Sequence, residues 1–209
     1  MLFKDEGNVK KMLIIVTGIL GLIIYYQYFY DGTNYIKSNI DGNFYRVRNN
    51  NENKANLLAI MHTKLNLIVS TLSSDVNYNK NINVKRLVKN WNNGISIKET
   101  GKMESDAAYV INKKHMSFCL QNKPDINASI VEDTNLMTYV GIHELSHIMS
   151  DEIGHGDEFI KNFEFLLSYA KQLNYFDPLL KQNMPIYIQL DKLNTADNYC
   201  GVPLINSIN

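Results

Sequence analysis

The longest apolar stretch of the chain lies near its N-terminus. No charged residue occurs between Met12 and Tyr30, and a helix of this length spans about 28 Å, close to the thickness of a bilayer core. Lysines precede the stretch, and tyrosines crowd its other end, where amphipathic rings favour the membrane interface. Bulky tyrosines also stand where signal-peptide cleavage needs small residues, so the pattern favours an uncleaved anchor over a signal peptide.

The polarity pattern divides the chain into four parts. Residues 1–11 form a short tail, residues 12–30 the transmembrane anchor, residues 31–41 a polar linker, and residues 42–209 a folded domain. More lysines precede the anchor than closely follow it, and the positive-inside tendency therefore favours a cytosolic N-terminus. We predict a single-pass membrane protein.

Within the domain, the hydrophobic periodicity changes between that of helices and that of strands. It predicts helices over residues 55–73, 82–93, 135–151 and 157–175, and strands over residues 42–49, 95–99, 107–111 and 116–120. The last two strands read as a hairpin. Lys85, Arg86 and Lys89 are interpreted as the exposed face of their helix. This order of elements favours an α+β fold, with a small sheet beside the helix over residues 135–151.

Composition and charge narrow the functional classes. The chain has 21 basic and 21 acidic residues, so no basic excess indicates a nucleic-acid partner. Cys119 and Cys200 are the only cysteines, which excludes a disulfide scaffold and leaves open one bridge or two thiols. A glycosylation sequon at Asn127 matters only if this part of the chain enters a secretory lumen.

Three of the five histidines lie within the stretch HELSHIMSDEIGH. On a helix, His143 and His147 are one turn apart on the same face, where a single Zn²⁺ can bind both imidazoles. Glu144 is rotated by about 100° from His143, so it can reach a zinc-bound water and accept its proton. His155 follows Gly154, whose freedom to adopt positive φ allows the chain to turn back and provide a third ligand.

Two assignments around this motif stay open in the sequence. Glu164, on the next predicted helix, is an alternative third ligand to His155. Attack of a zinc-bound water on a carbonyl group would form an oxyanion, and a side chain that stabilises this oxyanion is expected beside the metal. Tyr199 is preferred for this role because it lies in the motif YCG, and Tyr187 and Tyr109 are the alternatives.

The motif and its surroundings resemble the WLM and SprT-like zinc metallopeptidases. These families share H-E-x-x-H, a variable spacer, and a His followed by a small residue and then a Phe on the next helix. The segments NFYRVRNNNENKANLLAI, RLVKNW, KET and AAYVINKKHMSFCLQNK resemble the upstream part of the WLM type. YCGVPL is similar to a closing motif of members from large DNA viruses. The resemblance covers about residues 42–205.

The resemblance implies a zincin-like fold, with His143, His147 and His155 as zinc ligands and Glu144 as the general base. It also implies that Phe159 packs on the site and that the strand MSFCL is an edge strand that binds substrate backbone. The chain departs from the pattern in its spacer length, and no Met-turn is identifiable. The action of better-known relatives on DNA-crosslinked proteins is not carried over, because this chain has an anchor and no basic patch.

These observations predict a membrane-anchored zinc metallopeptidase. The resemblance to viral members implies that it is located in a virion membrane or an internal membrane of the host. Its cofactor is Zn²⁺, its substrates are proteins or peptides, and its contact with the lipid bilayer is through residues 12–30. The alternative is a structural membrane protein, for example of a virion, that retains a zincin-like fold without catalysis.

Overall fold

The computed structural model describes residues 6–29, 32–102, 104, 108–121, 130–131, 133–190, 198–200 and 202–203. The helices in this part are α1 (Glu6–Phe29), α2 (Glu52–Ser74), α3 (Ile82–Asn92), α4 (Thr134–Met149) and α5 (Asp157–Ala170). The strands are β1 (Thr33–Lys37), β2 (Phe44–Arg48), β3 (Ser96–Glu99), β4 (Ala108–Ile111), β5 (His115–Phe118), β6 (Asn174–Asp177), β7 (Gln182–Pro185), β8 (Asn198–Tyr199) and β9 (Val202–Pro203). The predicted α+β class is confirmed.

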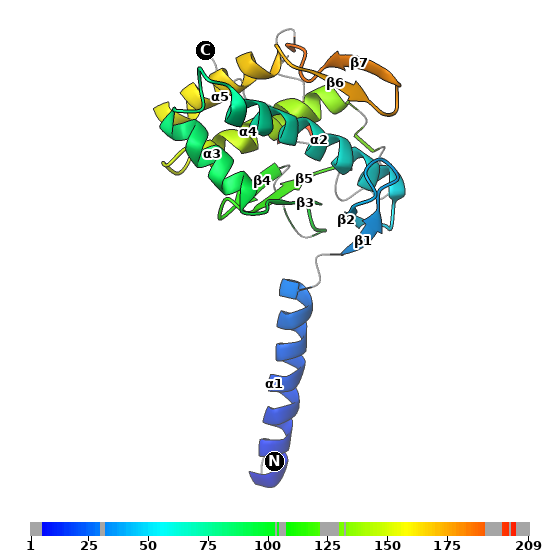
Figure 1. The fold of residues 1–209 in the computed structure, drawn as a ribbon. Coiled ribbons are helices and arrows are strands. Elements are labelled where there is room, and N and C mark those ends of the chain that lie inside the picture. Colours follow the sequence, from blue (N-terminus) through cyan, green and yellow to red (C-terminus); the bar gives the residue numbers. More distant parts are fainter. Residues whose placement is uncertain are drawn as a thin grey trace.

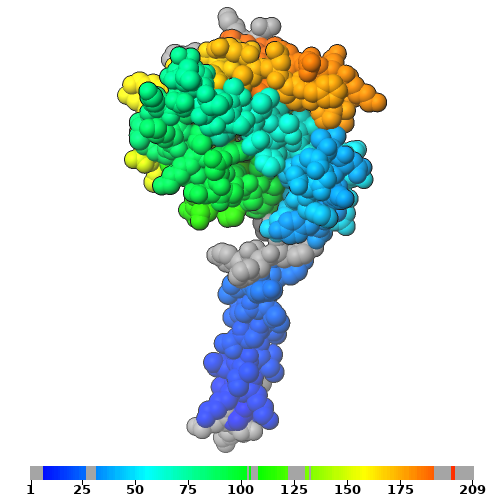
Figure 2. Space-filling view, viewed as in Figure 1, coloured from blue at the N-terminus to red at the C-terminus, as the bar shows by residue number. Residues whose placement is uncertain are grey.

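The apolar N-terminal stretch forms α1, which projects away from the rest of the molecule (Figures 1 and 2). Gly7–Tyr26 is long and apolar enough to cross a membrane, and none of it is buried against the protein. A helix of this kind fits a membrane span or a signal sequence. Tyr30, at the end of the predicted anchor, lies outside the described residues.

β1 to β5 form one mixed sheet in the order β1-β2-β3-β5-β4. The inner strands β2, β3 and β5 are parallel to one another, and the edge strands β1 and β4 are antiparallel to their neighbours. Figure 1 shows α2, α4 and α5 stacked on one side of this sheet. Buried side chains of the inner strands, including Val47, Met116 and Phe118, join the core with α2 and α4.

Two expectations about the sheet are wrong. Residues 33–37 of the predicted linker form β1, so the folded domain begins at Thr33 rather than at residue 42. The segment TNYIK has no apolar run, as is common for an edge strand. Its strand conformation is evident only from its pairing with β2. The strand of MSFCL is not an edge strand, because β5 has a partner on each side and β4 occupies the edge.

The two central helices, α2 and α4, pack closely where Gly141 of α4 meets α2. A Cβ atom on Gly141 would lie 2.8 Å from the Met61 side chain and 3.1 Å from that of Leu65. Helix starts follow their sequence signals, since the side chains of Asn51 and Asp133 accept hydrogen bonds from the first-turn N–H groups of α2 and α4. The long helix that carries the H-E-x-x-H motif is therefore held against the core along most of its length.

The C-terminal part of the domain differs more from the prediction. The helix expected to reach Tyr175 ends at Ala170, and residues 174–177 instead form β6 in a hairpin with β7. Asp177 fixes the turn by accepting hydrogen bonds from the N–H groups of Leu179 and Leu180, at 2.8 and 2.9 Å.

The two cysteines form a disulfide, which decides the alternative left open by the sequence. Cys119, just after β5, is bonded to Cys200 with a Cα–Cα distance of 6.2 Å. Cys200 lies in the turn between β8 and β9, with φ of +53°. The bond therefore attaches the C-terminal hairpin to the sheet. The predicted sequon at Asn127 lies outside the described residues.

Candidate metal centre

His143 and His147 lie on consecutive turns of α4, as their spacing predicts. Their ring centroids are 5.0 Å apart. Glu144, between them in sequence, is 4% exposed and lies in the core side of the helix. α4 thus offers two imidazoles and a buried carboxylate from one short segment of chain.

His155 is brought back to this pair by the loop that follows α4. Gly154 has φ of +89°, the left-handed conformation predicted for a reversal at this residue. The His155 ring lies 5.0 Å from that of His143 and 4.9 Å from that of His147. The nearest ligand nitrogens of the three rings all lie within 4.8 Å of one another. Three histidines within a stretch of thirteen residues therefore converge on one point.

The donor set has a composition that suits zinc, and the separation of one pair of its nitrogens fits a tetrahedral zinc site. Zn–N bonds of about 2.0–2.1 Å in a tetrahedral site separate the ligand nitrogens by about 3.3 Å. The Nε2 atoms of His143 and His155 are 3.1 Å apart. Two such nitrogens repel one another when both present lone pairs, and a shared cation removes that repulsion. Three imidazole ligands also leave a fourth position open, as in catalytic zinc sites.

The electrostatics favour the neutral imidazoles that bind metals. Burial, followed by the positive charge on the neighbouring histidines, lowers the pKa of His143 to about 3. Burial and His155 lower the pKa of His147 to about 4. Both rings are therefore uncharged at neutral pH, with a nitrogen lone pair available.

These pKa shifts predict how the folding stability of the metal-free chain depends on pH. The two histidines have pKa values near 6.5 when unfolded and lower values when folded, so between these values the unfolded state binds more protons. We expect the melting temperature of the chelator-treated protein to fall as the pH drops from about 6.5 toward 4. The melting temperature of the double variant His143→Gln, His147→Gln should depend less steeply on pH. Equal slopes for the variant and the parent chain would contradict the lowered pKa values.

Phe159 of α5 supports all three imidazoles. Its ring is fully buried and its centroid lies 4.8, 4.4 and 4.7 Å from those of His143, His147 and His155. This is the packing contact that the family resemblance implied for Phe159. Contact with one rigid ring limits the rotation of each imidazole, so the three rings are held in place before any metal binds.

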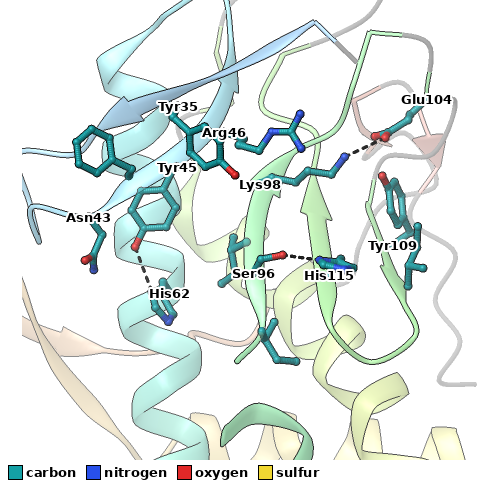
Figure 3. Close-up of a pocket in the computed structure, with 14 residues that line it drawn as sticks. Tyr35, Asn43, Tyr45, Arg46, His62, Ser96, Lys98, Glu104, Tyr109 and His115 are labelled. Carbon is teal, nitrogen blue, oxygen red and sulfur yellow. Dashed lines mark hydrogen bonds and ion pairs between the residues drawn. The ribbon is translucent and has the colours of Figure 1, made fainter. Parts of the chain in front are cut away.

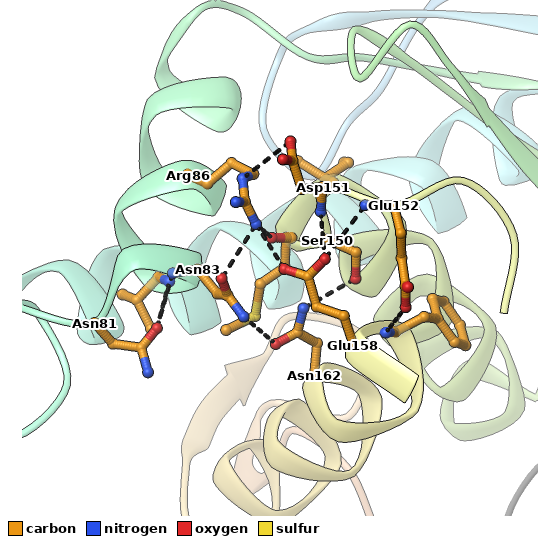
Figure 4. A network of polar contacts seen from close by, with 12 residues as sticks. Asn81, Asn83, Arg86, Ser150, Asp151, Glu152, Glu158 and Asn162 are labelled. Carbon is orange, nitrogen blue, oxygen red and sulfur yellow. Dashed lines mark hydrogen bonds and ion pairs between the residues drawn. The ribbon is translucent and has the colours of Figure 1, made fainter. Parts of the chain in front are cut away.

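The loop that carries His155 is fixed by two carboxylates that bond across it (Figure 4). Glu158 accepts hydrogen bonds from the N–H groups of Asp151 and Glu152, at 2.9 and 3.3 Å. Glu152 in turn accepts one from the N–H of Phe159, at 2.9 Å. Gly156, the N-cap of α5, has no side chain to cap that helix, and Glu152 takes over this function. A carboxylate of α5 thus binds N–H groups of the loop, and a carboxylate of the loop binds an N–H group of α5.

Arg86 of α3 joins this loop to the end of α4. Its guanidinium donates hydrogen bonds to the carbonyl of Met149 and to the carboxylate of Glu158, both at 2.8 Å (Figure 4). Asn90, also on α3, donates to the carbonyl of Ile148 at 3.2 Å. These donors satisfy carbonyls at the C-terminus of α4, where a cation also interacts favourably with the helix dipole.

The role of Arg86 was missed in the sequence, where this residue was interpreted as part of an exposed face. Its side chain is only 23% exposed, whereas Lys85 and Lys89 are exposed as expected. A signal did exist. Asn83, Arg86 and Asn90 recur at spacings of three and four residues, which places them on one face of α3, and the structure shows that this face contacts α4 and α5.

We expect Arg86→Gln to weaken zinc binding without removing a ligand. Loss of the bonds to Met149 and Glu158 loosens the loop that positions His155, and supporting contacts of this kind are worth about tenfold in metal affinity. Competition with a chromophoric chelator measures this effect. Lys85→Gln is the matched control, since it removes the same charge from the exposed side of the same helix. Equal affinities of the two variants would show that Arg86 does not position the loop.

The remaining predicted site residues lie elsewhere. Glu164 is exposed on α5 and is not part of the histidine cluster. Tyr187 is buried and accepts a hydrogen bond from the N–H of Leu190, and Tyr109 lines a cavity on the sheet. Tyr199 is 1% exposed, and its hydroxyl donates a 2.6 Å hydrogen bond to the carbonyl of Cys119.

The predicted general base nevertheless acts electrostatically on Tyr199. Burial, followed by the negative charges of Glu144 and Glu99, raises the pKa of Tyr199. The phenol is therefore protonated at neutral pH, and it donates this proton in its hydrogen bond to the Cys119 carbonyl. Its role as the oxyanion-stabilising group stays a prediction.

Comparison with known proteins identifies relatives in large DNA viruses. No family model matches the chain. It is 28% identical over 174 residues to uncharacterized protein R325 of Acanthamoeba polyphaga mimivirus, and the match covers 80% of each protein. It is also 32% identical over 97 residues to uncharacterized protein 136R of Invertebrate iridescent virus 6, and 34% identical over 76 residues to uncharacterized protein 042R of Invertebrate iridescent virus 3.

The two iridescent virus matches cover 45% and 36% of this chain, and 54% and 46% of those proteins. The chain thus spans about half the length of each. No solved structure matches the chain.

Proposed function

We propose that the protein is a membrane-anchored zinc metallopeptidase of the WLM and SprT-like type, with a zincin-like domain. The observation that carries this proposal is the convergence of His143, His147 and His155, with Glu144 next to His143 on the same helix. A structural metal site usually closes all four coordination positions with protein ligands, whereas three histidines next to a carboxylate fit a site that keeps one position for water or substrate.

Each residue of the site has a separate role in the proposed hydrolysis. The three histidines would hold zinc, which when bound would supply a Lewis acid for the scissile carbonyl and make water more acidic. Glu144 accepts the proton of the attacking water and returns it to the leaving amine. Its burial keeps the carboxylate away from bulk solvent, which strengthens its interaction with a developing positive charge. Phe159 and the Arg86 contacts hold the imidazoles in position.

The edge strand β4 is the part of the sheet suited to hold the substrate backbone. It pairs with β5 on one side, and within the described residues no strand pairs with its other side. It also lies beside α4, which carries two of the histidines. An extended peptide could add to this edge by main-chain hydrogen bonds. This assigns to β4 the role that the resemblance had implied for MSFCL.

The location of the proposed enzyme follows from α1 and the disulfide. We interpret α1 as an uncleaved anchor. Disulfides persist in oxidising surroundings, so the bond between Cys119 and Cys200 is compatible with a domain on the translocated side of the membrane. The balanced charge supports no nucleic-acid partner.

The purified full chain in vesicles tests the proposal directly. We expect about one zinc per chain by elemental analysis, and cleavage of a broad peptide library that stops when the metal is removed with a chelator. Bound zinc without cleavage would favour the alternative, a structural membrane protein with the same fold. Absence of stoichiometric zinc from the purified chain would overturn both the peptidase proposal and this alternative.

A further inference from the structure

One face of the sheet has no helix packed on it in the described part of the chain. The inward side chains Val47, Ile97 and Met116 lie in the core. The alternating positions Arg46, Lys98 and Ser96 point to the opposite face, where Figure 3 shows them. We call this the outer face. Figure 1 places it on the side of the domain from which α1 projects.

The outer face is hollowed and is rich in exposed aromatic and aliphatic side chains. A cavity of about 750 Å³ opens on it, with Tyr35, Phe44, Tyr109 and Ile111 among its lining residues. The cavity extends inward to Tyr45, Ile97 and His62 of α2. Tyr35 is 69% exposed and Phe44 is 63% exposed. Exposed apolar groups gathered in one place mark contact sites rather than ordinary surface.

Polar groups on the outer face have an arrangement typical of a membrane interface. The guanidinium of Arg46 lies 5.7 Å from the centre of the Tyr35 ring. Lys98 forms an ion pair with Glu104 at 3.1 Å (Figure 3). Tyrosines beside long basic side chains are enriched where proteins meet lipid head groups, because each combines an apolar body with a polar end.

The chain keeps this face close to the end of α1. Three residues separate Phe29, the last residue of α1, from Thr33, the first residue of β1. At no more than about 3.6 Å per residue, this connection is at most about 14 Å long. If α1 spans a bilayer, β1 therefore begins at its surface, and Tyr35 lies two residues further along the strand.

We propose that the outer face rests on the head-group layer of the phospholipid bilayer that α1 spans. Tyr35 and Phe44 insert at the interface, and the cavity accommodates phospholipid head groups. The histidine cluster lies on α4 and the loop before α5, in the helix layer on the other side of the sheet.

Tryptophan fluorescence of the full chain in vesicles tests this orientation. Single variants Tyr35→Trp and Phe44→Trp are placed in phosphatidylcholine vesicles with one fifth phosphatidylserine, with or without lipids brominated near the head group. Emission from Trp91 in the parent chain is subtracted. We expect brominated lipid to reduce the added emission of both variants by about half or more, because both side chains lie at the interface.

Phe176→Trp is the matched control. Phe176 is 58% exposed on β6, in the hairpin on the side of the domain away from α1 (Figure 1), and its emission should not change with brominated lipid. Quenching of Tyr35→Trp and Phe44→Trp no greater than that of Phe176→Trp would overturn the proposal. Failure of the parent chain to sediment with vesicles would overturn it together with the anchor, while zinc binding and peptide cleavage, measured separately, would still stand.

Discussion

Replacing Glu144 by Gln should reduce peptide cleavage about 10³-fold while leaving zinc bound. General base catalysis contributes on the order of 10²–10⁴ in rate. Gln has nearly the same shape as Glu but cannot accept the proton of the attacking water. Glu144 is not one of the converging ligands, so its amide variant retains the metal site. The measurement is the initial rate of cleavage of a peptide that the parent chain cuts, with zinc content determined on the same samples.

Glu164→Gln is the control for this experiment. It makes the same chemical change on the exposed side of α5, and we expect it to cleave at the rate of the parent chain. Undiminished cleavage by Glu144→Gln would show that another group is the base. Loss of zinc from Glu144→Gln would show instead that this carboxylate is needed to hold the metal.

Replacing His155 by Ala should lower zinc affinity by more than about 100-fold. Supporting contacts around a metal are worth about 10- to 100-fold, and loss of a direct ligand exceeds this. His143 and His147 remain, but two ligands on one helix leave the metal half-coordinated by protein. Metal content after dialysis and chelator competition measure the loss without reference to activity. We also expect zinc to raise the melting temperature of the parent chain and not that of the variant.

His115→Ala is the matched control, because His115 is an exposed histidine on β5 that lies outside the cluster. This variant should bind zinc as the parent chain does. Zinc affinity that is unchanged in His155→Ala would remove His155 from the ligand set. The sequence alternative Glu164 would then be tested by its own replacement with Ala.

Local sequence patterns predicted the elements whose signals lie within a few residues. The apolar run of α1 and the stripe of α2 depend on neighbours along one turn or two. The same holds for the hairpin of β4 and β5, whose turn has positive φ at Asn112 and Lys113. Predictions failed where a partner outside the segment decided the outcome. This holds for β1, which pairs with β2, for the position of β5 in the sheet, and for the end of α5, after which β6 pairs with β7.

The sequence by itself determined the chemistry of the candidate site. The spacing of His143 and His147 places them on one face of any helix, and Gly154 permits the reversal that returns His155. Only the tertiary structure decided how that arrangement is held. Arg86 reaches the end of α4 across 63 residues of chain, and Cys119 bonds with Cys200 across 81. Periodicity along the chain reports which face a side chain occupies, whereas contacts of such separation depend on how whole helices and strands pack, which no local pattern encodes.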